Sequence, residues 1–157
     1  MSHESVRAFF AAHAPDVPII DQGASTATVD EAAAALGVAP ARIAKTLSLR
    51  IGTEVALVVA RGDARLNNGK AKAALGAKPR MLGAHEVEEV TGHPVGGVCP
   101  FGLASPLPIY CDVSLKDFDT VFPAAGSRTS SVELTPARLA ELTAARWIDI
   151  CTLPQED

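Results

Sequence analysis

The chain has 157 residues and a net charge of −4, and 48% of its residues are apolar, mainly Ala, Val, Leu and Ile. These values exclude a disordered or fibrous protein and, taken over the whole chain, a general nucleic-acid binder. No apolar run reaches the roughly 20 residues that span a bilayer, and the start of the chain lacks the basic and apolar regions of a signal peptide. We therefore expect a single domain over residues 1–157, located in the cytoplasm, with neither a membrane nor DNA as a partner.

Apolar spacing and capping residues predict the elements of the N-terminal half. Helices are expected at 5–13, at 29–36 with Thr28 as N-cap and Gly37 as C-cap, and at 40–44, and strands at 18–21, 45–51 and 54–60. Thr28 and Glu31 have the spacing of a capping box, in which each side chain satisfies a free N–H group at the start of the helix. Only Gly52-Thr53 separates the last two strands, so we expect them to pair as a hairpin.

Lys45 begins the strictly alternating strand 45–51. Alternate side chains of a strand share one face, so Lys45 lies on the face of Leu47, Leu49 and Ile51. This parity predicts an ammonium group at the rim of the core. A lysine that reaches from the strand end into water is the alternative that the pattern leaves open.

The C-terminal half continues with short helices and strands. Helices are expected at 68–75, 85–91, 114–117 and 135–144, and strands at 79–82, 107–113, 131–134 and 147–151. About seven short strands between helices predict a mixed α/β fold, in which helices surround a curved mixed sheet or barrel.

The cysteines and histidines give no pattern for a metal site. Cys99, Cys111 and Cys151 are odd in number and widely spaced, so we expect neither disulfides nor a zinc site. Cys111 and Cys151 lie in strand-like runs and are interpreted as small buried residues. His85 and His93 are expected at the surface or at caps. We predict no metal and no cofactor.

Positive charge is concentrated in residues 42–80, which carry nine Lys or Arg against two acids. That segment has a net charge of +7 and the rest of the chain −11. Such a cluster is either a solvated surface or a contact for a phosphate backbone. The residues assigned to the second interpretation, contact with the phosphate backbone of a polyanionic partner, are Arg65, Lys70, Lys72, Lys78 and Arg80.

A glycine- and proline-rich segment at 92–103 separates a predicted helix from a predicted strand. It holds four glycines and two prolines in twelve residues. Glycines allow positive φ and close approach of a ligand, and prolines stiffen the backbone, so such a loop can present free N–H groups to an anion. An ordinary surface loop is the alternative.

Three motifs in this order resemble the YbaK/ProX family, the free-standing relatives of the editing domain inserted in bacterial prolyl-tRNA synthetases. They are Ala44-Lys45-Thr46-Leu47, the 91–102 segment, and Ala125-Gly126-Ser127-Arg128 with Val132-Glu133-Leu134 after it. The resemblance covers nearly the whole chain. It implies a barrel-like mixed sheet, hydrolysis of the ester of a mischarged aminoacyl-tRNA, most often a tRNA for proline, and prolyl-tRNA synthetase as a partner.

The resemblance also assigns residues. Lys45 matches the functional lysine of the family, and Gly96, Gly97 and Val98 belong to its Gly-x-x-x-Pro loop, so these four form the predicted catalytic set. The family's mechanism implies that the loop N–H groups stabilise an oxyanion, that Lys45 neutralises a phosphate or fixes the acyl group, and that water attacks. The predicted substrate-binding set is Thr28, Thr46, Cys99, Pro100, Phe101, Gly126, Ser127, Arg128 and Ser131.

Several alternatives remain open. Relatives often have Gly after the residue matching Arg128, and cysteine-acting members carry an acid near Ser131, whereas this chain has Thr129-Ser130-Ser131. The amino acid removed could thus be Cys, Ala, Ser, Thr or 2-aminobutyrate. A non-catalytic module that binds tRNA or the synthetase is the competing class. The hypothesis of a hydrolase with Cys99 as nucleophile is weaker than these two, because the sequence places no histidine to activate the thiol.

Overall fold

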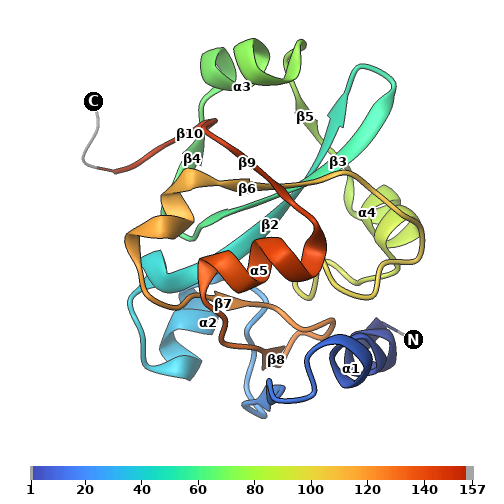
Figure 1. Cartoon of the computed structure of the whole chain (residues 1–157), viewed down its shortest axis with the longest axis vertical. Coiled ribbons are helices and arrows are strands. Elements are labelled where there is room, and N and C mark those ends of the chain that lie inside the picture. The colour runs from blue at the N-terminus through green and yellow to red at the C-terminus, as the bar shows by residue number, and fades with distance from the viewer. Residues whose placement is uncertain (1, 155–157) are drawn as a thin grey trace.

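The computed structural model describes residues 2–154, and its five α-helices lie around a central mixed sheet (Figure 1). The helices are α1 (Ser2–His13), α2 (Val29–Leu36), α3 (Asn68–Leu75), α4 (Ala84–Thr91) and α5 (Pro136–Thr143), with 3-10 helices η1 (Pro40–Arg42) and η2 (Val113–Asp117). In Figure 1, α3 lies at the upper end of the molecule, α1 and α2 lie at the lower end, and α5 lies in front of the sheet. None of the helices within residues 2–154 is long and apolar enough to cross a membrane.

The main sheet has six strands in the order β5-β2-β3-β6-β9, with β7 also paired to β2. Its strands are β2 (Ile43–Ile51), β3 (Glu54–Arg61), β5 (Arg80–Met81), β6 (Ile109–Asp112), β7 (Phe122–Pro123) and β9 (Arg146–Ile148). Two small antiparallel sheets pair β1 (Ile20–Asp21) with β8 (Ser130–Ser131), and β4 (Arg65–Leu66) with β10 (Cys151–Thr152). The pairing β2–β3 is antiparallel, while β6 and β7 join the sheet in parallel. The predicted mixed α/β fold is confirmed.

The predicted hairpin of β2 and β3 is the centre of this sheet. The two strands pair over eight residues of each, from Ala44 opposite Arg61 to Ile51 opposite Glu54. Leu49 and Leu57 are fully buried in it, which removes apolar surface from water and stabilises each side chain by about 1.5–3 kcal/mol. Thr28 and Gly37 cap α2 as predicted, the latter at φ 70°.

Three expectations for local structure are wrong. Residues from Pro40 form a single 3-10 turn, because β2 already begins at Ile43, where it pairs with Phe122 of β7. The predicted closing strand breaks into β9 and β10, since the N–H of Ile150 donates to the Asp112 carboxylate at 2.9 Å instead of to a strand. With the unpredicted short strands β4 and β7, the residues described by the structure contain ten strands in place of about seven.

One edge of β2 is only partly covered. On the side away from β3, β7 pairs with its start at Ile43–Ala44 and β5 pairs near its end at Leu49–Arg50. The N–H of Leu82, directly after β5, donates to the carbonyl oxygen of Ser48 at 3.0 Å, so among the described residues the stretch 45–47 has no strand partner on this side. The gap in the sheet lies where the sequence places Lys45 and Thr46.

Candidate active site

A cavity of about 300 Å³ opens at this gap in the sheet. Its wall is mostly apolar, with Ile43, Ala44 and Phe122 at one end and Met81 and Leu82 at the other. Further lining residues come from the 26–32 segment and the Gly/Pro loop: Thr26, Ala27, Thr28, Val29, Ala32, Val95, Gly96 and Val98. Lys45, Thr46, Ser48, Ala84, Val87, Ala124 and Ser131 complete it. Six predicted site residues therefore line this cavity: Lys45, Gly96, Val98, Thr28, Thr46 and Ser131.

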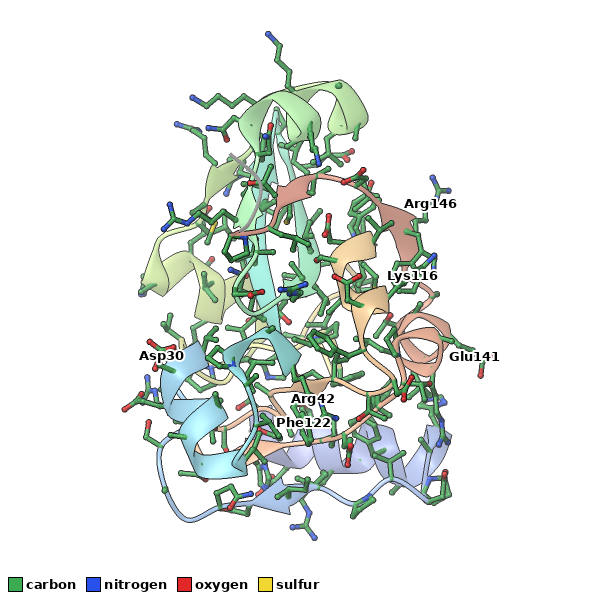
Figure 2. The ribbon with its side chains drawn as sticks, turned by 90° about the vertical axis from the view of Figure 1, so that its left-hand side faces the viewer. Asp30, Arg42, Lys116, Phe122, Glu141 and Arg146 are labelled. Carbon is green, nitrogen blue, oxygen red and sulfur yellow. The ribbon has the colours of Figure 1, made fainter. Side chains whose placement is uncertain are left out.

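Phe122 is held in the cavity wall by a cation from η1. The guanidinium of Arg42 lies 5.1 Å from the centre of the Phe122 ring, and Figure 2 shows the two side chains next to each other. Arg42 also donates from Nε to the carbonyl oxygen of Thr120 at 3.3 Å. This arrangement fixes the end of the cavity at which β7 joins β2.

Two hydroxyl groups on the cavity wall are buried and have no hydrogen-bond partner among residues 2–154. They belong to Thr26 and Thr46, and the whole Thr26 residue is only 6% exposed. A buried hydroxyl without a partner costs about 1–3 kcal/mol, so an occupant that supplies polar atoms here recovers this cost. Thr46 was predicted from the sequence, whereas Thr26 was missed, because nothing in its local sequence distinguishes it from the exposed Ser25 beside it.

The loop that lines the opposite wall has less free backbone than the sequence predicts. Gly96 and Val98 line the cavity, but the N–H of Gly97 donates to the carbonyl oxygen of Pro94 at 2.9 Å and closes a turn. Gly96 has φ +94°, and a Cβ atom there would lie 2.9 Å from the Cβ of Ala27. The loop and the 26–28 segment are thus in direct contact, which closes the cavity on that side.

Gly97 supports the loop from behind. A Cβ atom on Gly97 would lie 2.9–3.0 Å from three backbone atoms of Ser127. Nε of Arg128 donates to the carbonyl oxygen of Val95 at 2.8 Å, and the carbonyl oxygen of Arg128 accepts from the N–H of Thr26 at 2.6 Å. The 127–128 segment therefore contacts both the Gly/Pro loop and the 26–28 segment and holds them in place.

Of the remaining residues of the predicted substrate-binding set, some line the cavity and others lie off its wall. Thr28 and Ser131 line the cavity, although the Thr28 hydroxyl also caps α2 by accepting from the N–H of Glu31 at 3.1 Å. Gly126 packs against α1, where a Cβ atom would lie 2.8 Å from the carbonyl oxygen of Ser2. The Ser127 hydroxyl bonds that of Ser130 at 2.6 Å. Neither Gly126 nor Ser127 lies on the cavity wall.

Cys99, Pro100 and Phe101 are buried and lie off the cavity wall. Phe101 packs in the core with its ring centroid 4.7 Å from that of Phe10 in α1. His93, expected at the surface or at a cap, is fully buried, because its Nε2 bonds the carbonyl oxygen of Phe101 at 2.7 Å. This bond ties the two ends of the loop together, which the spacing of the residues did not reveal.

The geometry argues against Cys99 as a nucleophile, although a histidine does lie next to it. Sγ of Cys99 is 3.6 Å from Nε2 of His93, a contact that the sequence did not predict. Burial raises the pKa of the Cys99 thiol to about 12 and lowers the pKa of His93, so the thiolate is disfavoured. Cys111 and Cys151 are buried as predicted.

Lys45 lies at the cavity border with a half-buried side chain. Its ammonium donates to the carbonyl oxygen of Ala64, in the turn that follows β3. Burial lowers the pKa of Lys45, while the nearby Asp63 carboxylate acts in the opposite direction. The ammonium is thus held by backbone rather than free in water, the alternative that its place at a strand end had left open.

The predicted tRNA-binding residues lie on α3, β4, β5 and the segment between α3 and β5, at the upper end of Figure 1. Arg65, Lys72, Lys78 and Arg80 are exposed and form no ion pair with any of residues 2–154. Lys70 differs from them, because its ammonium lies 3.3 Å from the Asp149 carboxylate and donates to the carbonyl oxygen of Cys151. Within the same residues, no three His, Cys, Asp or Glu side chains are grouped as a metal site would require.

Comparison with known proteins agrees with this fold and its motifs. The model of the aminoacyl-tRNA editing domain matches residues 24–142. The uncharacterized protein YwhH of Bacillus subtilis strain 168 is 50% identical over 153 residues, which are 96% of this chain and 98% of YwhH. The proline–tRNA ligase of Shouchella clausii is 34% identical over 134 residues, and the match covers 83% of this chain but only 23% of the ligase.

Solved structures give the same result. One described as a "putative trans-editing enzyme for prolyl tRNA synthetase" has a TM-score of 0.88 and 32% identity, covering 96% of this chain and 97% of the other. A second, described as "hypothetical protein APE2540", has a TM-score of 0.87 and 34% identity, covering 94% of this chain and 99% of the other.

The fold and the cavity define an editing domain of the kind that recognises an aminoacyl-tRNA. The chain belongs to the aminoacyl-tRNA editing domain family, and the YbaK/ProX resemblance inferred from its motifs is confirmed.

Proposed function

We propose that the protein is a trans-editing deacylase that hydrolyses the ester of a mischarged tRNA for proline carrying a small amino acid. The observation that carries this proposal is the cavity that Lys45 and Gly96 border together, with two buried hydroxyls left free for an occupant. The similarity to a structure described as a trans-editing enzyme for prolyl-tRNA synthetase supports the choice of tRNA. The proposal includes a cytoplasmic location, where tRNA is charged and used, and a role for prolyl-tRNA synthetase as partner.

The proposed chemistry relies on orientation and charge and needs no metal. The acyl group occupies the cavity, where the hydroxyls of Thr26 and Thr46 bond its polar atoms. The N–H groups of Gly96 and Val98, which bond no backbone group of the described residues, stabilise the carbonyl oxygen as it becomes an oxyanion. Lys45 neutralises the terminal phosphate or fixes the acyl group, and a water molecule attacks with help from the ribose hydroxyl.

The amino acid removed is limited by size. The cavity volume of about 300 Å³ must hold the acyl group and part of the terminal ribose, which favours Cys, Ala, Ser, Thr and 2-aminobutyrate over larger side chains. A methylene group contributes only about 1–3 kcal/mol to discrimination in such a pocket. We therefore propose that the amino acid removed from tRNA for proline is a small one, such as Cys, Ala or 2-aminobutyrate.

A panel of labelled aminoacyl-tRNAs tests the function. We expect release of at least one small amino acid from tRNA for proline, well above spontaneous hydrolysis, and little release of proline itself. Binding of the same tRNAs without release would favour the competing proposal of a non-catalytic module. Absence of both binding and release would contradict both proposals.

The exposed cations around α3 are expected to bind the tRNA backbone. Changing both Lys72 and Lys78 to Glu should weaken binding by about tenfold at moderate salt and leave the single-turnover rate at saturation unchanged, because these residues lie off the cavity wall. The slope of log affinity against log salt should become shallower by roughly one to two, since each phosphate contact contributes about 0.7–0.9 to it.

Arg7→Glu provides the control for this pair. Arg7 is exposed on α1, at the end of the molecule opposite α3, and the change reverses the same kind of charge. If Arg7→Glu weakens binding as much per charge as the α3 changes do, net charge rather than this surface determines affinity, and the lysines belong to a solvated face.

A further inference from the structure

The turn at residues 61–64 lies beside Lys45. In the β2–β3 hairpin, Lys45 pairs with Ala60, so the chain leaving β3 passes directly next to the start of β2. The N–H of Ala64 donates to the carbonyl oxygen of Arg61 at 2.9 Å and closes the turn. The carbonyl oxygen of Ala64 then accepts the hydrogen bond from the Lys45 ammonium.

Close backbone packing fixes the position of this turn. A Cβ atom on Gly62 would lie 2.1 Å from the carbonyl oxygen of Pro40 and 3.1 Å from that of Ile43. No larger side chain fits there without displacement of η1 or of β2 itself. The turn is therefore held at a set distance from the strand that carries Lys45.

A second set of contacts fixes its conformation. The guanidinium of Arg61 donates to both carboxylate oxygens of Asp63, at 2.6 and 2.9 Å, and to the carboxylate of Asp117 at 2.8 Å. The Arg61 side chain is only 11% exposed and lies over the ring of Phe118. Because paired, two-contact bonds to a guanidinium restrict both partners, the first and third residues of the turn are locked to each other.

Asp63 also adds a charge next to Lys45. The bond to Arg61 lowers the pKa of Asp63, so the carboxylate is ionised at neutral pH. Its negative charge opposes the effect of burial on the pKa of Lys45 and so favours the charged ammonium. The turn thus supplies a carbonyl acceptor and a compensating charge at the same place.

We propose that Asp63 and Arg61 are positioning residues for Lys45, because they hold the turn whose Ala64 carbonyl fixes the ammonium at the cavity border before substrate arrives. The inference rests on the proposed function for its consequence in catalysis. An ammonium has three N–H donors, so the bond to Ala64 leaves two for the substrate. A lysine fixed in advance loses less conformational freedom on binding, and this lowers the barrier to the reaction.

A double-mutant cycle tests the link between Asp63 and Lys45. Asp63→Ala is expected to lower kcat/KM for deacylation by about fivefold to tenfold, and in a Lys45→Ala background to lower it by less than twofold, since Asp63 acts through Lys45. Asp16→Ala is the matched control, because it removes a carboxylate that has two 2.7 Å bonds to Arg138 and lies away from the cavity. It should leave kcat/KM unchanged in both the wild-type and the Lys45→Ala background. A full, multiplicative loss in the Lys45→Ala background would overturn the proposal.

A measurement without substrate separates this inference from the function. In protein with ¹³C-labelled lysine, the Cε signal of Lys45, assigned by its disappearance in Lys45→Arg, should be displaced from those of exposed lysines. It should move to their position in Asp63→Ala and stay in place in Asp16→Ala. An unchanged Lys45 signal in Asp63→Ala would refute the positioning role even if the protein deacylates tRNA.

The two results are independent of each other. If the wild-type protein hydrolyses no aminoacyl-tRNA, the proposed function fails while the NMR result still decides whether the turn positions Lys45. Should Asp63→Ala not fold, Asp63→Asn is measured in its place, because its amide keeps one acceptor for Arg61 and removes the charge. The same displacement and the same coupling to Lys45 are expected for it.

Discussion

Replacing Lys45 with alanine is expected to slow deacylation by about 10²-fold or more, which corresponds to about 2.7 kcal/mol of transition-state stabilisation. The physical reason is the removal of the cation that borders the same cavity as Gly96 and Val98, where residues 2–154 supply no other Lys or Arg to the lining. Charge neutralisation needs a cation of sufficient reach and no deprotonation, so Lys45→Arg should keep more activity than Lys45→Ala. Single-turnover hydrolysis of the substrate found in the aminoacyl-tRNA panel measures both.

Stability must be measured alongside activity for this variant. Lys45 is only half-buried, so its loss should change the free energy of unfolding far less than the activation barrier. Lys72→Ala, which removes an exposed cation from α3, is the matched control and should leave the single-turnover rate at saturating substrate unchanged. Hydrolysis by Lys45→Ala at the wild-type rate would contradict the mechanism proposed for this cavity.

Replacing Gly96 with alanine should lower kcat/KM by between about 10- and 100-fold. The φ of +94° disfavours any side chain, and the new Cβ atom would lie 2.9 Å from the Cβ of Ala27, so the loop or the 26–28 segment must move. A displacement of about 1 Å at reacting groups is enough for a loss of this size. The cavity wall and the two N–H donors would shift together.

Gly76→Ala separates the backbone strain from the contact. Gly76 caps α3 with φ +85°, close to the φ of Gly96, and a Cβ atom there would have nothing within 4 Å. Gly76→Ala should lose about 1–2 kcal/mol of stability, as expected for a left-handed alanine, and Gly96→Ala at least as much because of the added contact, but only Gly96→Ala should lose activity. Equal activity of the two variants would mean that the loop position does not control the reaction.

Local sequence signals predicted the framework of the site. The alternation of Lys45 to Ile51 gave both the strand and the placement of Lys45 at the core's edge, and Thr28 with Glu31 gave the start of α2. Such signals succeed because period, caps and tight turns depend on residues close together in the chain. The family motifs added the loop that borders the same cavity as Lys45.

Contacts between distant residues could not be predicted in the same way. His93 is buried where it bonds the carbonyl oxygen of Phe101, whose ring packs against Phe10 of α1. The hydroxyl of Thr26 is buried because the backbone of Thr26 bonds Arg128, far along the chain. Cys99 illustrates the same limit, because its loop position suggested access to substrate while its side chain is directed into the core. One sequence does not encode, in any local pattern, which side of a loop faces a cavity.

The uncovered stretch of β2 also bears on how this protein avoids association with other chains. An open sheet edge exposes unpaired N–H and C=O groups, and long edges of this kind recruit extended segments from neighbouring molecules. Here β7, β5 and the bond from the N–H of Leu82 to the carbonyl oxygen of Ser48 leave only residues 45–47 uncovered, which at about 3.3 Å per residue is an opening of roughly 10 Å. A strand long enough to pair stably does not fit in an opening of this length. The sheet can therefore present backbone to a ligand without becoming a site of aggregation.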